Sequence, residues 1–327
     1  MLDLTLACGR YDRVQPLLDG RVRPEGIELN TISIGPEECF WRMLQNSEFD
    51  VAEMSLASYS IATANGDERF VGIPAFLSRS FRHSSMYVRE DGDIRAPADL
   101  AGKRIGVPEY QMTASVWTRG LLVDDFDVDL TDVTWCTGGL EQPGRVERQP
   151  LRLPDSVHVE PLAHDSTLSD ALVEGDIDAL MAPRVPRVFR QTDGIRRLFP
   201  DYRARELDYY ERTSIFPIMH LVVVRREIVE KHPWVPRSLY KAFCEAKSIS
   251  TAGLADLPAL PYTMPFLLAA LEEQEEVFGA DPWPYGLEQN RNTLETFMSY
   301  LRQQGLCERP PNPEDLFSPS TLVEFRI

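Results

Sequence analysis

The stretch "LQNSEFDVAEMS", residues 44–55, has a close counterpart in "LVEGDIDALMAP", residues 172–183. Each passes from the end of a helical segment, through a polar turn and an aspartate, into a short apolar strand. Two such helix–turn–strand units far apart in one chain predict two lobes of similar construction.

Apolar and amphipathic segments alternate around both units. Strand-like and helical segments follow one another at 2–7, 28–34, 37–45, 51–54, 58–64 and 70–77, and again at 104–107, 113–123, 133–136 and 179–181. This alternation predicts βαβ units and an α/β fold with mostly parallel sheets. A strong β run at 218–224 precedes a helix that begins near Pro236, with Leu239, Phe243 and Ala246 on one face. We therefore expect residues 1–90 and 215–327 to form one lobe and residues 91–214 the other.

Composition narrows the class of protein. A chain of 327 residues with 43% hydrophobic content is long enough for about two domains. Its net charge of -17 argues against nucleic acid and anionic membranes as partners, because both require a basic surface. No segment reaches the length of about 18 apolar residues that a membrane span needs.

The opening residues and the cysteines bear on the compartment. The segment "LTLACG" resembles a lipoprotein cleavage box, but neither a cationic start nor a long apolar stretch precedes it, so we expect a cytoplasmic protein. The five cysteines are scattered without CxxC spacing, which predicts free thiols rather than disulfides or a zinc site.

Polar side chains gather where the predicted strands end. Ligands of open α/β sheets bind beyond the carboxyl ends of the strands. The residues in these positions are Arg10, Glu53, Ser55, Arg79, Arg82, His83, Tyr110, Thr113 and Arg184, and His220 lies within the run 218–224. Arginine matches a carboxylate bidentately, and the helix start at Thr113 also favours negative charge. The pattern predicts a site for a small anion or dianion, and the absence of GxxxxGK argues against a nucleoside triphosphate.

Each of these residues also has a simpler explanation. An arginine after a strand is often a solvated rim residue, His83 and His220 could be structural, and Glu53 could neutralise an arginine. Neither a GxSxG elbow nor an HExxH helix is present, so a hydrolase triad and a zinc helix are not indicated. A scattered metal site stays open.

Several blocks carry a family resemblance that spans nearly the whole chain. Together with residues 49–59, the stretches "GKRIGVPEYQMTASVWTRGLL" (102–122) and "PIMHLVVVRREIVEKHPWVPRSLYKAF" (217–243) resemble the type II periplasmic-binding-protein fold, two lobes with a ligand cleft between them. More narrowly, "CGRYDRVQPLLDGRVRPEGIELN" (8–30), "FDVAEMSLASY" (49–59) and "IPAFLSRSFRHSSMYV" (73–88) resemble the 4,5-dihydroxyphthalate decarboxylase family. The polar stretch 138–160 matches poorly and is interpreted as a variable loop.

The resemblance implies a cytoplasmic carboxy-lyase that converts a dihydroxylated aromatic dicarboxylate to protocatechuate and carbon dioxide. Arg79 and Arg82, with Arg10 or Arg184, would hold the carboxylates, and we expect Ser55, Tyr110 and Thr113 to contact substrate. For the chemistry we nominate His83 as the acid that protonates the ring carbon, His220 as the alternate, and Glu53 as the acceptor at the phenol. No organic cofactor is implied, whereas a divalent metal chelated by the catechol stays open.

Two other functions compete with this one. A non-catalytic binding protein or sensor for an aromatic or dicarboxylic anion would need the arginines but no imidazole beside the bound ring. A relative of pyrimidine synthases on the same fold would be expected to carry a Cys-rich motif, which the sequence lacks. For assembly we expect a homo-oligomer with a small-molecule substrate, and neither nucleic acid nor membrane as a partner.

Overall fold

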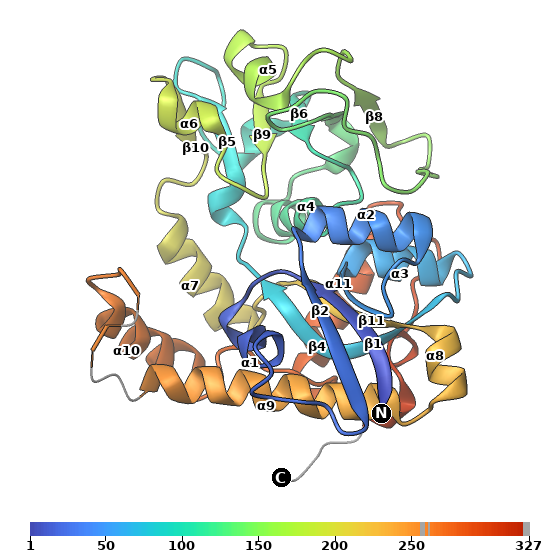
Figure 1. Cartoon of the computed structure of the whole chain (residues 1–327). Helices are drawn as coiled ribbons and strands as arrows, with labels where there is room; N and C mark the ends of the chain where they lie inside the picture. The colour runs from blue at the N-terminus through green and yellow to red at the C-terminus, as the bar shows by residue number, and fades with distance from the viewer. Residues whose placement is uncertain (256–258, 261, 323–327) are drawn as a thin grey trace.

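Two separate β-sheets, each flanked by helices, form the two lobes of the protein (Figure 1). The structure is a computed structural model that describes residues 1–255, 259–260 and 262–322. The first sheet has the order β2-β1-β3-β11-β4 and consists of β1 (Leu2–Cys8), β2 (Ile27–Ser33), β3 (Val51–Ser55), β4 (Phe70–Arg79) and β11 (Ile218–Arg225). Strand β1 runs parallel to β2 and β3, whereas β11 runs antiparallel to β3 and β4.

The second sheet repeats this plan with one strand more. Its order is β10-β5-β9-β6-β7-β8, from β5 (Met86–Arg89), β6 (Arg104–Val107), β7 (Thr134–Thr137), β8 (His158–Pro161), β9 (Ala179–Met181) and β10 (Ile195–Arg197). Strands β6 to β9 pair in parallel, and β5 pairs antiparallel with β9 and β10. The predicted α/β fold is confirmed, but both sheets are mixed, with as many antiparallel as parallel strand pairs in the first.

The two matching sequence units lie in different sheets. In the first, α2 (Pro36–Asn46) leads into β3, and in the second, α5 (Leu168–Glu174) leads into β9. Both helices end at a residue in the left-handed conformation, Ser47 at φ 49° and Gly175 at φ 86°. The same local device therefore stops a helix and starts a strand in each lobe.

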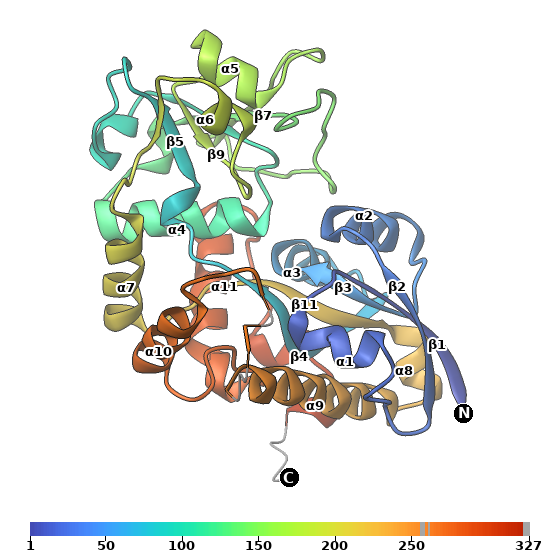
Figure 2. The ribbon, with the colours of Figure 1, turned by 60° about the vertical axis from the view of Figure 1, so that its left-hand side comes forward.

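Helices cover both sheets, and α9 (Val235–Ala255) runs along the far side of the first lobe from the second (Figures 1 and 2). Leu239, Phe243 and Ala246 of α9 are fully buried, as their spacing predicts. The remaining helices are α1 (Gln15–Leu18), α3 (Leu56–Ala64), α4 (Thr113–Phe126), α6 (Arg187–Gln191), α7 (Tyr202–Thr213), α8 (Arg226–Lys231), α10 (Leu267–Phe278) and α11 (Arg291–Gln303).

Strand pairing shifts one predicted boundary. Strand β5 pairs with β9 and β10 of the second sheet, although the expected first lobe extends to residue 90. The chain thus leaves the first sheet after Arg79 and enters the second at Met86.

Helix α4 belongs to the cores of both lobes and lies between the two sheets (Figure 2). Residues 113–122 are all buried. Trp117 packs into the core of the first lobe, where its indole Nε1 donates to the Ile218 carbonyl at 2.9 Å, while Leu122 packs into the core of the second lobe. A helix that is buried on every side joins the two lobes.

Two further sequence predictions concern the chain as a whole. All five cysteines are free, as their spacing predicts. Within the described residues, no helix has the length and apolar character needed to cross a membrane.

Candidate active site

The centre of the site is formed by two neighbouring strands of the first sheet. All five residues of β3 are buried, among them Glu53. Strand β11 brings His220 alongside, and the pairing of β11 with β4 is irregular on both sides of His220. Such irregularities redirect side chains and are common next to active sites. The His220 side chain keeps 20% of its surface exposed beside a fully buried carboxylate.

Glu53 is held by three hydrogen bonds. His220 Nδ1 lies 2.6 Å from Glu53 Oε1, the Tyr11 hydroxyl donates to the same oxygen at 2.8 Å, and the Gly9 N–H donates to Oε2 at 2.9 Å. Burial by itself would raise the pKa of Glu53, but the hydrogen bond and charge of His220, with the bonds from Gly9 and Tyr11, keep that pKa below its ordinary value. The carboxylate is therefore ionised and fixes Nδ1 of His220 as the nitrogen that donates to it.

Tyr11 is packed tightly against this carboxylate. A Cβ atom on Gly9 would lie 2.8 Å from the Tyr11 ring, so only glycine allows the approach. The Arg13 guanidinium lies over the Tyr11 ring at 4.4 Å and over the Trp283 ring at 4.1 Å. Burial, with the charge of Glu53, raises the pKa of Tyr11, so its hydroxyl remains a donor.

Phe40 of α2 contacts both His220 and an arginine of the second lobe. The rings of Phe40 and His220 meet edge to face with centroids 4.7 Å apart, and the Arg148 guanidinium lies 5.3 Å from the Phe40 centroid. One buried aromatic ring thus contacts both the imidazole and a cation of the second lobe.

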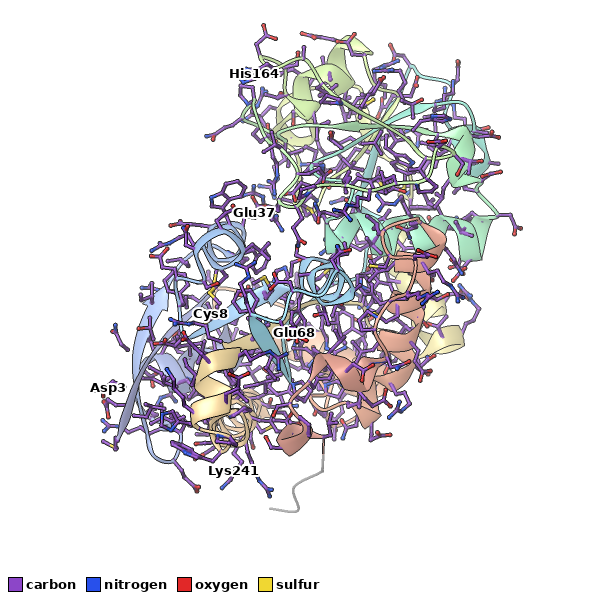
Figure 3. All side chains as sticks on the ribbon, turned by 90° about the vertical axis from the view of Figure 1, so that its right-hand side faces the viewer. Asp3, Cys8, Glu37, Glu68, His164 and Lys241 are labelled. Carbon is purple, nitrogen blue, oxygen red and sulfur yellow. The ribbon has the colours of Figure 1, made fainter. Side chains whose placement is uncertain are left out.

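Arg148 lines a cleft of about 720 Å³ between the lobes. This volume falls in the range of ~300–1,000 Å³ that is typical of small-molecule sites. Its walls come from α2 on one side and from the segments around 139–148 and 184–185 on the other, and Figure 3 shows Glu37 where the first lobe faces the second. The lining residues include Glu37, Trp41, Glu109, Arg145, Val146, Arg148, Arg184 and Val185.

Three arginines of the cleft share two carboxylates. Arg145 donates to Glu109 Oε1 at 2.9 Å and to Glu37 Oε2 at 2.8 Å, Arg148 lies 3.0 Å from Glu109, and Arg184 lies 3.7 Å from Glu37. Burial would raise the pKa of Glu37, but the charge and hydrogen bond of Arg145, with the charges of Arg184 and Arg148, together lower that pKa. These five side chains carry one positive charge in excess, and Glu141, which also lines the cleft, pairs with Arg187 instead. The guanidinium groups can bind an anionic ligand.

The chain is similar in sequence to known proteins along its whole length. A 4,5-dihydroxyphthalate decarboxylase from Comamonas testosteroni is 41% identical over 327 residues, which are 100% of this chain and 99% of the relative. The chain belongs to the 4,5-dihydroxyphthalate decarboxylase family. A second member, from Pseudomonas putida, is 43% identical over 214 residues, 65% of this chain and 83% of its own length. No protein-family model matches the chain.

Solved structures confirm the fold of this decarboxylase family member. The periplasmic aliphatic sulphonate binding protein SsuA from Escherichia coli superposes with a TM-score of 0.50 at 16% identity, covering 100% of this chain and 95% of its own. The ligand-binding component of an ABC-type import system from Staphylococcus aureus gives a TM-score of 0.53 at 12% identity, covering 98% of each chain. The expected two-lobed type II periplasmic-binding-protein fold is thus confirmed.

Among the residues expected at the site, the structure brings together Glu53 with His220 and Ser55 with Thr113. The hydroxyls of Ser55 and Thr113 lie 2.9 Å apart and join the starts of α3 and α4. Thr113 Oγ1 also accepts from the Ala57 N–H at 3.0 Å, and Ser55 Oγ accepts from the Ser58 N–H at 3.3 Å. These hydroxyls therefore cap a helix and tie β3 to α4.

Arg79 is buried inside the first lobe. It donates to the carbonyls of Phe216 at 2.9 Å and Pro284 at 2.6 Å and also to the Asn290 side chain, and burial lowers its pKa to about 9. The expectation that Arg79 binds a carboxylate is not supported, because its Nη donors serve carbonyl and amide oxygens of its own lobe.

Arg82 and Tyr110 also bond within the protein. Arg82 donates to the Pro183 carbonyl at 3.4 Å, and burial lowers its pKa to about 10, an effect that the charge of Glu206 opposes. The fully buried Tyr110 donates its hydroxyl to the Gln304 carbonyl at 3.1 Å. Neither residue lines the cleft.

His83 lies apart from the Glu53–His220 pair. Its ring is 2% exposed and packs edge-on against Phe199 and Tyr209, with centroids 5.9 and 5.6 Å away. It lines a different cavity, of about 330 Å³, together with Asp124, Asp125 and Arg212. Burial lowers the pKa of His83 to about 4, so the ring is neutral at physiological pH.

The two outermost arginines of the prediction are exposed. Arg10 follows β1 on the surface, and the Arg184 side chain is 69% exposed at the cleft. Of the four arginines expected to bind the ligand, Arg184 alone lines the cleft.

The sequence analysis missed Phe40, Arg145 and Arg148 and gave Tyr11 no role. Arg145 and Arg148 stand three residues apart in the stretch 138–160, which was interpreted as a variable loop. That stretch begins directly after β7, so the rule about strand ends applies to it as well. Phe40 carried no signal beyond a place on the apolar face of α2.

Metal binding has no obvious place in the described part of the chain. Within those residues, no group of three or more His, Cys, Asp or Glu side chains is arranged to hold an ion.

Proposed function

We propose that this chain catalyses the decarboxylation of 4,5-dihydroxyphthalate to protocatechuate and carbon dioxide. The observation that carries the proposal is the hydrogen-bonded pair of His220 and Glu53, joined through Phe40 to Arg148 of an arginine-lined cleft, in a member of the 4,5-dihydroxyphthalate decarboxylase family. The pair itself does not line the cleft. An arginine cleft accounts for binding a dianion, and an imidazole held by a buried carboxylate accounts for moving a proton.

The substrate contributes much of the chemistry. Each of its carboxylates is para to a hydroxyl, whose electrons make the carboxylate-bearing ring carbon basic. A proton added at that carbon forms the new C–H bond. The electron pair of the C–C bond to the carboxylate then returns to the ring as carbon dioxide leaves, and aromaticity is restored. One proton is consumed in each turnover.

His220 is the proposed proton donor. Its Nδ1 is engaged with Glu53, so Nε2 is the nitrogen available to the substrate. Glu53 stabilises the imidazolium and holds the ring in one tautomer, and the Tyr11 hydroxyl fixes the carboxylate in turn. Because Glu53 is fully buried and its oxygens serve three protein donors, we assign it a positioning role instead of the expected contact with the phenol.

The arginines of the second lobe are the proposed carboxylate ligands. Arg148 is a buried cation in contact with Phe40, which also contacts His220, so we assign it to the carboxylate beside the reacting carbon. Arg145 and Arg184 would take the carboxylate that remains in the product, in exchange for Glu37. Because Phe40 contacts both His220 and Arg148, the substrate ring would lie beside Phe40.

Cofactor, compartment and assembly belong to the proposal as well. No organic cofactor is needed, because the para hydroxyl supplies the electrons; a metal chelated by the two hydroxyls is the alternative. A cytoplasmic location accords with five free cysteines. A homo-oligomer stays the expectation for assembly, and light scattering of the purified protein would measure its mass.

The decisive experiment is an assay of carbon dioxide release. Purified protein is incubated with 4,5-dihydroxyphthalate, with its monohydroxylated analogues and with phthalate, each with and without a chelator. We expect release from the dihydroxylated compound, and solvent deuterium at the vacated ring position. Tight binding of these compounds with no carbon dioxide from any, with or without added divalent metal, would instead establish a binding protein or sensor.

A further inference from the structure

A second cavity of about 590 Å³ lies where the segment 150–154 meets the chain that follows α11. It shares no lining residue with the cleft. Its walls include the guanidinium-bearing side chains of Arg152, Arg302 and Arg309, and the buried side chain of Gln111. We call it the rear cavity.

The three arginines of the rear cavity have no protein partner among the described residues, where none of them forms an ion pair or a side-chain hydrogen bond. All three are exposed, in a chain with 51 acidic and 34 basic residues. Arg291, which begins the helix that carries Arg302, pairs with Glu288 at 2.7 Å. Glu308 lines the rear cavity but does not come within ion-pair distance of the arginines. Three unpaired cations against the carboxylate of Glu308 leave a positive excess around the cavity, which favours an anion inside it.

Gln111 adds a requirement for the ligand. It is 1% exposed, and its Nε2 donates to Glu147 Oε2 at 3.0 Å and to the Gln149 carbonyl at 2.8 Å. Its Oε1 is buried without a hydrogen-bond partner among the described residues. A buried acceptor of this kind needs a donor, so the fitting ligand is an oxyanion that also carries an O–H group.

The rear cavity is physically connected to the cleft. Gln111 donates hydrogen bonds to Glu147 and Gln149, which are the two neighbours of Arg148 in the chain. The other wall is equally tight, because a Cβ atom on Gly305, which has a φ of +72°, would lie 2.5 Å from Pro154 Cδ. A ligand that moves the segment 150–154 therefore also moves the residues that place Arg148.

We propose that the rear cavity is a second binding site, for a small oxyanion with an O–H group, and that its occupancy shifts Arg148 in the cleft. Hydrogen phosphate and a hydroxylated aromatic carboxylate share this chemistry. The site itself is independent of the proposed function, whereas its effect on turnover rests on that function.

The binding test uses inorganic phosphate. Its effect on the thermal midpoint is measured at constant ionic strength for the wild type, for Arg302→Gln/Arg309→Gln, and for Arg21→Gln/Lys241→Gln as a matched loss of two exposed charges. A ligand that binds only the folded state raises the midpoint with concentration. We expect about tenfold weaker phosphate binding in the rear-cavity variant only, since each charge-assisted hydrogen bond it loses is strong. Equal phosphate dependence in all three proteins would overturn the site.

Two further arms complete the test. Arg148→Gln should bind phosphate as the wild type does, since Arg148 lies outside the rear cavity; loss of binding there would place the ion in the cleft and overturn the proposal. In that background, 3,4-dihydroxybenzoate is compared with phosphate, and the tighter ligand identifies the source of the oxyanion. If the double variant fails to fold, Arg309→Gln alone replaces it.

The effect on the cleft is measured separately. In a protein shown to release carbon dioxide, phosphate should change the KM for the dicarboxylate by about twofold or more in the wild type and not in Arg302→Gln/Arg309→Gln. Phosphate binding at the rear cavity with an unchanged KM would keep the site and overturn its coupling to Arg148. Failure of the decarboxylase assay leaves the phosphate test intact, so the two proposals fail separately.

Discussion

His220 Nδ1 lies 2.6 Å from Glu53 Oε1, although the register of β11 and β3 places Ser55, not Glu53, opposite His220. The contact is therefore diagonal across two antiparallel strands, and the irregular pairing of β11 with β4 around His220 accompanies it. A diagonal pair of this kind brings a titratable ring and a buried carboxylate together on one face of a sheet.

Replacing His220 should separate chemistry from binding. His220→Gln keeps hydrogen-bonding capacity but cannot donate a proton to carbon, so we expect turnover to fall by about 10² or more while dicarboxylate affinity changes by only about a few-fold. Single-turnover kinetics with titration calorimetry would measure both quantities. The matched control is His83→Gln, which should retain turnover; loss of turnover in His83→Gln with an active His220→Gln would restore His83 as the acid.

Glu206 should make the protein less stable as the pH rises. Burial raises its pKa to about 7 from 4.5, and its Oε1 has no hydrogen-bond partner among the described residues. Because the folded pKa exceeds the unfolded value, its contribution to stability is fully present below pH 4.5 and is lost as the pH rises through about 7. The thermal midpoint of Glu206→Gln should therefore exceed that of the wild type at alkaline pH and converge with it in acid. The exposed Glu211→Gln on the same helix serves as control, and parallel curves for all three proteins would contradict the assignment.

Arg148 and Arg79 should respond differently to substitution. Losing one partner of a desolvated charge pair costs about 2–5 kcal/mol. Arg148→Gln should therefore weaken phthalate binding far more than catechol binding. Arg79→Gln should lower the thermal midpoint and leave the ratio of the two affinities unchanged, because Arg79 serves internal carbonyls. If Arg79→Gln instead weakened phthalate binding selectively and Arg148→Gln did not, Arg79 would be the residue that binds the dicarboxylate.

Glu37 should compete with the ligand for Arg145. Its carboxylate accepts from Arg145 at 2.8 Å across the cleft, and its lowered pKa keeps it charged at neutral pH. Glu37→Gln should therefore tighten dicarboxylate binding by about a few-fold, as expected for removing a rival carboxylate. Titration calorimetry against Glu38→Gln, an exposed neighbour paired with Arg42, would measure the change. Weaker binding in Glu37→Gln would mean that Glu37 helps to assemble the site.

The sequence predicts the strands of the site better than it predicts the contacts between their side chains. The apolar runs that became β3 and β11 were predictable, because burial imposes a hydrophobic pattern on the local sequence. The pairing of His220 with Glu53 was not, since it depends on register between strands distant in the chain. Proximity to a strand end selected Glu53, and His220 was a candidate within the run 218–224, but neither observation could show that the two residues would meet.

The arginines show why a rule about position does not predict direction. Arg79 is the last residue of β4, yet its side chain points into the first lobe. There it donates hydrogen bonds to carbonyl groups of segments that come later in the chain. Arg145 and Arg148 lie in a long polar stretch without strand or helix patterning, and only its folded path brings them to α2. These side chains are placed by tertiary contacts, which leave no periodic signal in the sequence.

Because α4 belongs to both cores, neither lobe can fold without the other. Trp117 packs into the core of the first lobe and Leu122 into the core of the second. The chain therefore cannot be divided into two fragments that each fold. Heating should accordingly produce one cooperative transition in place of two, despite the two sheets. A substitution that destabilises α4 would destabilise both lobes. Residues on the surfaces of the cleft can therefore change in evolution far more freely than residues of the helix that joins its walls.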